Sequence, residues 1–207
     1  MHQPPVVLAP LSPIAFLTHI LDTAPTSTTS TTTVLICAAR SDFLRAAVTE
    51  LHDRAHPPSA APDVLRATLG RVAAARRIRT SFVPSVAHLR AHVSALPPPA
   101  VPARLLVYGF LDVHRDAGGW SAQDIGCSAA CLVEAARGGL VLMLREPTGW
   151  GAEEEEEGKK GAQWPAAYEE QIPLLSTAAE RREDGTWDVP CTTARVVLQR
   201  WFTFDDS

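Results

Sequence analysis

The segment that decides the fold is Arg104-Leu105-Leu106-Val107-Tyr108-Gly109, an almost unbroken apolar run. Two other runs have the same character, Val34-Leu35-Ile36-Cys37-Ala38 and Leu140-Val141-Leu142-Met143-Leu144. A strand that is buried on both faces has a continuous apolar sequence, whereas a strand with one face in water alternates apolar and polar residues. The sequence therefore predicts that these three segments are central strands of one sheet. Ile78–Val83 is a fourth strand candidate.

Helical patterns separate the predicted strands. Most of them begin with a serine, which can accept a hydrogen bond from the first turn of a helix. The expected helices cover residues 12–21, 41–54, 63–75, 85–96 and 121–137. Strands that alternate with helices of this length indicate a parallel sheet with helices on both faces. The predicted fold class is α/β, with three layers and a mostly parallel sheet.

The composition suits a single domain over residues 1–207, since 207 residues with 46% hydrophobic side chains can bury one core. The threonine- and serine-rich segment 23–33 is predicted to be disordered, and the acidic stretch 149–162 to be a solvated loop. Beyond residue 146 the pattern weakens. A short strand is expected at 172–176, and the apolar segment 192–204 fits a helix or a strand equally well.

Two sequence features bear on location. The longest apolar run, Gly139–Leu144, is far shorter than the roughly 20 residues that span a bilayer. The chain also begins without the charged and apolar regions of a signal peptide. We therefore expect a soluble intracellular protein with no membrane contact.

The formal net charge of −4 is unevenly distributed along the chain. Residues 40–115 hold eleven arginines against five acids, a balance of +6, whereas residues 116–207 are strongly acidic. The densest basic group is a candidate for binding nucleic-acid phosphates, although helix ends also collect basic residues because of the helix dipole. Its members are Arg71, Arg76, Arg77, Arg79 and Arg90.

The usual catalytic motifs are missing. A phosphate-binding loop needs closely spaced glycines followed by lysine, but the first glycine of the chain is Gly70 and the first lysine is Lys159. Asp112, His114 and Glu146 follow predicted strands and could form an acid/base site, but no nucleophile is paired with them. We therefore favour a polar surface turn at Asp112 and His114, and assign no catalytic residue, metal ligand or cofactor.

The C-terminal segment combines arginine with aromatic residues, a composition that is enriched where proteins bind one another. Arg195, Arg200, Trp201 and Phe202 are therefore candidate interface residues. The alternative is that the segment packs as the last element of the core. We favour the core for Trp201 itself, and the interface for the two arginines, which are too polar to be buried without partners.

The succession of elements resembles the core of RecA-type ATPases over residues 12–146. The segments that carry the resemblance are the strand candidates at 34–38 and 78–83, then Leu105-Leu106-Val107-Tyr108-Gly109-Phe110-Leu111-Asp112, the serine-started helix, and Leu140–Glu146. The segment Arg-Ile-Arg-Thr-Ser-Phe-Val-Pro-Ser at 77–85 is most similar to the small degenerate recombinase paralogues of Shu-type recombination-mediator complexes. The lysine loop and the magnesium aspartate of the family are missing, so ATP hydrolysis does not carry over.

The resemblance implies a non-catalytic nuclear subunit of a recombination-repair complex, which supports a recombinase filament on single-stranded DNA. Its expected partners are other RecA-like or mediator-complex subunits. Two alternatives stay open. One is the degenerate RecA-like ring of the Elongator accessory complex, which acts in transfer-RNA modification. The other is a small-molecule enzyme with its site near Asp112, His114 and Glu146.

Overall fold

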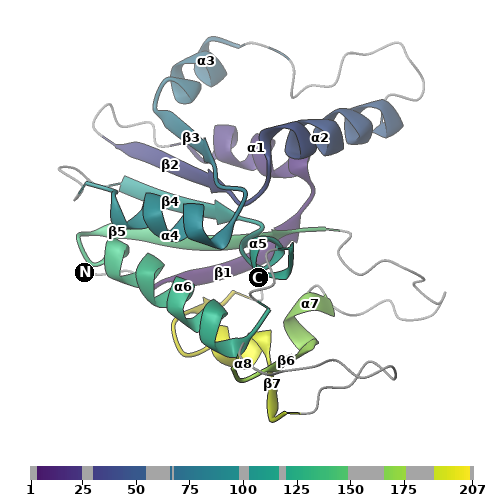
Figure 1. Cartoon of the computed structure of the whole chain (residues 1–207). Helices are drawn as coiled ribbons and strands as arrows, with labels where there is room; N and C mark the ends of the chain where they lie inside the picture. The colour runs from purple at the N-terminus through teal and green to yellow at the C-terminus, as the bar shows by residue number, and fades with distance from the viewer. Residues whose placement is uncertain are drawn as a thin grey trace.

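A six-stranded sheet forms the centre of the computed structural model, which describes residues 4–24, 30–54, 66, 68–97, 103–116, 120–148, 166–175 and 189–205 (Figure 1). The strand order is β3-β2-β4-β5-β1-β8, and every neighbouring pair is parallel. The strands are β1 (Val6–Leu11), β2 (Thr31–Ile36), β3 (Ile78–Phe82), β4 (Ala103–Tyr108), β5 (Leu140–Pro147) and β8 (Thr203–Phe204).

Helices cover both faces of this sheet. The helices of the described chain are α1 (Pro13–Asp22), α2 (Arg40–Arg54), α3 (Leu69–Ala75), α4 (Val86–Ser94), α5 (Phe110–Asp116), α6 (Ala122–Ala136), α7 (Ala166–Glu169) and α8 (Ala194–Leu198). Figure 1 shows α4 and α6 on one side of the sheet and α1 and α2 on the other. A separate antiparallel pair joins β6 (Gln171–Pro173) to β7 (Cys191–Thr193). The predicted three-layer α/β fold with a parallel sheet is confirmed.

The core consists of two apolar clusters, one on each side of the sheet. Leu105 and Leu144 belong to the larger cluster, which lies under α4, α6 and α8 and continues to Phe202. Phe16 of α1 and Tyr108 of β4 anchor the smaller cluster, where their rings stack with centroids 4.2 Å apart. The three segments that were expected to be central strands are buried on both faces, as predicted.

The sequence analysis missed β1, which supplies the strand between β5 and β8. Its sequence, Val-Val-Leu-Ala-Pro-Leu, contains Pro10, and proline cannot donate a hydrogen bond within a sheet. The structure accommodates Pro10 because the pairing of β1 with β5 shifts register between Leu8 and Leu11. The irregularity leaves this proline outside the regular ladder.

The expected disorder of segment 23–33 is wrong at its C-terminal end. Thr31–Thr33 begin β2; all three pair in register with β4, and Thr32 and Thr33 also pair with β3. Threonine is β-branched and fits a paired strand well, so a low-complexity composition did not prevent strand formation here. Residues 25–29 and the acidic stretch 149–162 lie outside the described residues.

Two further boundaries differ from expectation. The helix predicted over 63–75 is described only from Leu69, where the Thr68 side chain caps α3, and residues 63–65 lie outside the described part. The apolar segment 192–204 is neither one helix nor one strand, because it contains β7, α8 and β8 in succession. Within the described residues, no helix is long and apolar enough to cross a membrane.

The neighbouring aromatic residues Phe202 and Trp201 predict opposite mutational effects. Phe202 is 3% exposed in the larger cluster, whereas Trp201 is 38% exposed. Phe202→Ala should lower the free energy of unfolding by about 3–5 kcal/mol, as large-to-small core substitutions do. Trp201→Ala should lower it by less than Phe202→Ala does, because more of the Trp201 side chain is already in water. Urea denaturation of the two variants measures both values, and a larger loss for Trp201→Ala would contradict this packing.

Candidate functional site

The carboxyl edge of the sheet is the first place to look for a ligand, because parallel α/β sheets bind ligands where their strands end. Two helices begin at this edge directly after a strand. These are α1, which follows β1, and α5, which follows β4. The unpaired amides of such first turns attract anions, and phosphate-binding loops use this geometry.

An internal carboxylate occupies the amino end of α1. Ser12 caps the helix, and its hydroxyl donates a hydrogen bond to Glu50 Oε1 of α2. The second oxygen of Glu50 accepts a hydrogen bond of 2.8 Å from the amide of Ile14. The negative group that this helix end favours is therefore supplied by the protein itself.

A cavity of about 630 Å³ adjoins this helix end, between α1, α2 and Thr148. Its charged lining consists of Asp42, Glu50, Asp53 and Arg45. Three carboxylates against one arginine give the described lining an excess of acidic groups, and Arg45 forms an ion pair with Asp42 at 3.2 Å. Such a lining repels a phosphate group.

A second internal carboxylate lies at the start of α5. The amide of Leu111 donates hydrogen bonds of 3.1 and 3.3 Å to the two oxygens of Glu146, which follows the core of β5 and is 3% exposed. Burial raises the pKa of Glu146 to about 8, because desolvation outweighs the hydrogen bonds from the amides of Leu111 and Phe110. Glu146 is therefore protonated at neutral pH.

Buried side chains close the edge around Glu146. Cys37, which follows β2, is 3% exposed, and Tyr168 of α7 is fully buried. Burial raises the pKa of both groups well above their ordinary values, and Asp112, together with Glu146 once it ionises at high pH, adds to the effect. The strand ends of β2, β4 and β5 thus surround a packed polar cluster instead of an open pocket.

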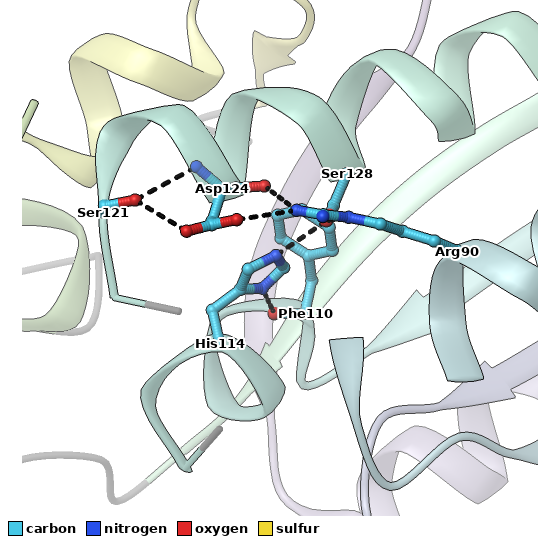
Figure 2. Close-up of polar contacts among 6 residues, drawn as sticks. All are labelled: Arg90, Phe110, His114, Ser121, Asp124 and Ser128. Carbon is cyan, nitrogen blue, oxygen red and sulfur yellow. Dashed lines mark hydrogen bonds and ion pairs between the residues drawn. The ribbon is translucent and has the colours of Figure 1, made fainter. Parts of the chain in front are cut away.

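A hydrogen-bond network centred on His114 lies between α4, α5 and α6 (Figure 2). Nδ1 of His114 lies 2.8 Å from the carbonyl oxygen of Phe110, which can only accept, so Nδ1 carries the proton. Burial lowers the pKa of His114 to about 4, so the ring is neutral at pH 7. Its Nε2 then accepts the hydrogen bond from Ser128 Oγ at 2.9 Å.

Arg90 connects this pair to α4. Its Nε donates to Ser128 Oγ at 2.9 Å, and its Nη2 donates to the backbone carbonyl of Asp124 at 2.8 Å and to its Oδ1 at 3.2 Å. Ser121 donates to the other oxygen of Asp124 at 3.0 Å. The network therefore joins three helices through hydrogen bonds whose donor and acceptor roles are all consistent (Figure 2).

Ser128 and His114 have the relative placement of a nucleophile and its general base. However, Ser128 is 1% exposed and His114 is fully buried, so no substrate atom can approach the hydroxyl. The interpretation of Asp112 and His114 as a polar surface turn is wrong, because both belong to α5. Helix α5 begins directly after Gly109, and His114 lies on the same buried face of this helix as Phe110.

The candidate nucleic-acid residues do not form one group. Arg90 is engaged in the network above, and its assignment as a phosphate contact stays a prediction. Arg71 forms an ion pair of 3.5 Å with Asp22 and is largely covered. Arg76 ends α3, and Arg79 lies on β3; both are exposed, while Arg77 between them is half-buried. We call Arg76, Arg77 and Arg79 the arginine patch.

The candidate interface residues divide in a similar way. Arg200 and Trp201 are exposed, whereas Phe202 is buried in the core, so Phe202 is not an interface residue of the isolated chain. Arg195 bonds to Glu169 at 3.2 Å and lies over the ring of Phe204, 5.0 Å from its centroid. The expectation that Trp201 lies in the core is also wrong, which leaves Trp201 beside Arg200 on the surface.

Several residues of the carboxyl edge were not found from the sequence. Glu50 lies 38 residues from Ser12, and Ser128 lies 14 residues from His114, so no local spacing connects them.

The sequence matches none of the protein-family models with which it was compared. A comparison with curated proteins also finds no significant match.

The shifted pKa values of His114 and Glu146 predict an unusual dependence of stability on pH. The folded chain keeps His114 neutral down to about pH 4, whereas the unfolded group binds a proton below 6.5, so stability falls as the pH drops from 6.5 to 4. The folded chain keeps Glu146 protonated up to about pH 8, whereas the unfolded group loses its proton above 4.5, so stability falls as the pH rises from 4.5 to 8.

The two effects cancel between pH 4.5 and 6.5, and the loss from Glu146 alone remains above 6.5. Glu146→Gln keeps an acceptor for the amide of Leu111 but cannot ionise. Between pH 6.5 and 8 the wild type should lose about 2 kcal/mol more than this variant, since one pKa unit corresponds to about 1.4 kcal/mol. Urea denaturation across this range measures the difference, and parallel pH profiles for the two proteins would contradict the assignment.

Proposed function

We propose that the protein is a non-catalytic RecA-like subunit of a DNA recombination or repair mediator complex that assists recombinase filament assembly. The observation that carries the non-catalytic part is the occupation of the carboxyl edge. Glu50 takes the amino end of α1, and Glu146 takes the first turn of α5. A nucleotide phosphate at either place would meet an internal carboxyl group, and the described part of the chain contains no lysine to neutralise it.

Exposed apolar side chains support a role in an assembly. Leu44 and Val48 lie four residues apart on α2 and are 44% and 49% exposed, and Leu69 of α3 is 91% exposed. Leu44 and Val48 share one face of α2, and an adjacent apolar pair of this kind would be buried by contact with another protein. Arg200 and Trp201 offer a second surface with the residue types that dominate binding energies.

The arginine patch supports contact with single-stranded DNA. The structure describes no ion pair for Arg76 or Arg79, so both guanidinium groups can reach phosphate oxygens. The same features would suit an Elongator-type accessory ring, whose partners act on transfer RNA. The small-molecule enzyme with a site near Asp112, His114 and Glu146 has less support, since His114 and Glu146 are inaccessible and only Asp112 is half-buried.

Affinity purification of the tagged chain from nuclear extract tests the proposal. We expect recombinase-related subunits in stoichiometric amounts. Trp201→Ala and Arg200→Ala should reduce their recovery at least fivefold while both variants remain folded at the temperature of the experiment, because both side chains are exposed. Gln199→Ala, also exposed and in the same turn, is the matched control. Recovery of Elongator subunits alone, or of no stoichiometric partner, would contradict the proposed function.

A further inference from the structure

A buried arginine of β5 has no partner among the described residues. Arg145 is 9% exposed, and the described part of the chain gives its side chain no hydrogen bond and no ion pair. Its Nε is buried and lacks an acceptor. Its two terminal nitrogens are not among the buried atoms without a partner, so they keep contact with solvent. Because an unpaired buried charge costs free energy, the stability of the fold does not explain Arg145.

Arg145 lies on the face of the sheet that α1 and α2 cover (Figure 1). Successive strand residues point to opposite faces, and Leu144 belongs to the larger cluster on the other face. The register places Leu8 of β1 and Tyr108 of β4 directly beside Arg145. Met143 lies two residues earlier on the same face, and both Leu8 and Met143 are half-buried. Arg145 therefore has partly open apolar surface beside it.

Positive charge gathers around Arg145. Burial lowers the pKa of His19 of α1, and the charges of Arg145 and Arg104 lower it further, while Asp22 acts in the opposite direction. The two guanidinium groups are thus near enough to the His19 ring to disfavour its protonation. Arg104 donates a hydrogen bond of 2.7 Å to the carbonyl oxygen of Thr23, a partner that carries no formal charge.

The nearby carboxylates have other partners. Asp22 forms an ion pair of 3.5 Å with Arg71 of α3. Glu50, whose charge acts on the neighbouring Tyr108, accepts two hydrogen bonds at the amino end of α1. Within the described residues Arg145 therefore has no counter-charge, and an anionic ligand would supply one.

We infer that Arg145 binds the carboxylate of a small aliphatic acid, whose chain lies along Leu8 and Met143. A guanidinium group matches the two oxygens of a carboxylate with two parallel hydrogen bonds. A phosphate group carries a third oxygen and up to two charges, so it would need further donors beside Arg145. Leu8 and Met143 offer apolar contact instead. The site shares no residue with the arginine patch or with the surface of Arg200 and Trp201, so the inference is independent of the proposed function.

Titration with hexanoate, followed by calorimetry and by histidine NMR, tests the inference. We expect saturable binding, and at least tenfold weaker binding of hexanol, which lacks the charge, of acetate, which lacks the chain, and of inorganic phosphate. Bound hexanoate should raise the pKa of His19, because its negative charge offsets the repulsion by Arg145 and Arg104. The His19 signal is identified by its loss in His19→Gln.

Two variants separate ligand binding from folding. Arg145→Met should weaken hexanoate binding at least tenfold and raise the melting temperature of the free protein, because it removes an unpaired buried charge. Arg79→Met is the matched control, since Arg79 is an exposed arginine on β3 of the same sheet, and it should leave the affinity unchanged.

Absence of saturable hexanoate binding to the wild type would overturn the inference. Equal losses in Arg145→Met and Arg79→Met would do so as well, as would binding that leaves the pKa of His19 unchanged or inorganic phosphate that binds more tightly than hexanoate. A lower melting temperature for Arg145→Met would show that Arg145 has a partner within the folded chain, which also contradicts the site. The purification experiment above uses other residues, so a failure of the proposed function would leave this result intact.

Discussion

Glu50 and Glu146 each direct a carboxyl group at the amides of a helix that begins at the carboxyl edge of the sheet. Backbone amides in a first helical turn need acceptors, and in many α/β proteins a bound phosphate supplies them. Here the acceptors come from within the chain. Because Glu50 belongs to α2 and Glu146 to β5, the same contacts also fix α2 against α1 and α5 against the sheet. Parallel α/β sheets commonly bind ligands at this edge. In this protein the edge instead holds helices and strands together.

The burial of polar groups near the carboxyl edge of the sheet determines their protonation. Desolvation keeps His114 neutral and Glu146 protonated, so the interior holds hydrogen-bonding groups with little net charge. Neutral His114 can accept from Ser128, which in turn accepts from Arg90, and this order of donors links α4 to α6. A catalytic site would need the same residues to be accessible. The network instead aligns the helices that cover the larger core cluster.

The sequence predicted the parts of the fold that depend on continuous burial. The segments around Leu105 and Leu142 have apolar residues on both faces, so their unbroken runs identify central strands without any tertiary information. Strand β1 could not be predicted from the sequence because it contains Pro10. The register shift that accommodates this proline depends on the pairing with β5. The candidate site was harder to predict. Glu50 reaches the start of α1 only through helix packing, and the burial of His114 follows from the immediate start of α5 after β4.

The reactivity of Cys37 tests most directly whether the carboxyl edge is closed. Its thiol follows β2 beside Glu146 and is 3% exposed, whereas Cys127 is exposed. In a variant with Cys127, Cys131 and Cys191 changed to serine, Cys37 is the single thiol that a disulfide reagent can modify. The account predicts that modification occurs no faster than global unfolding and accelerates with urea in parallel with it. Prompt modification of the native protein at the rate of an exposed thiol would show an open edge and contradict the account.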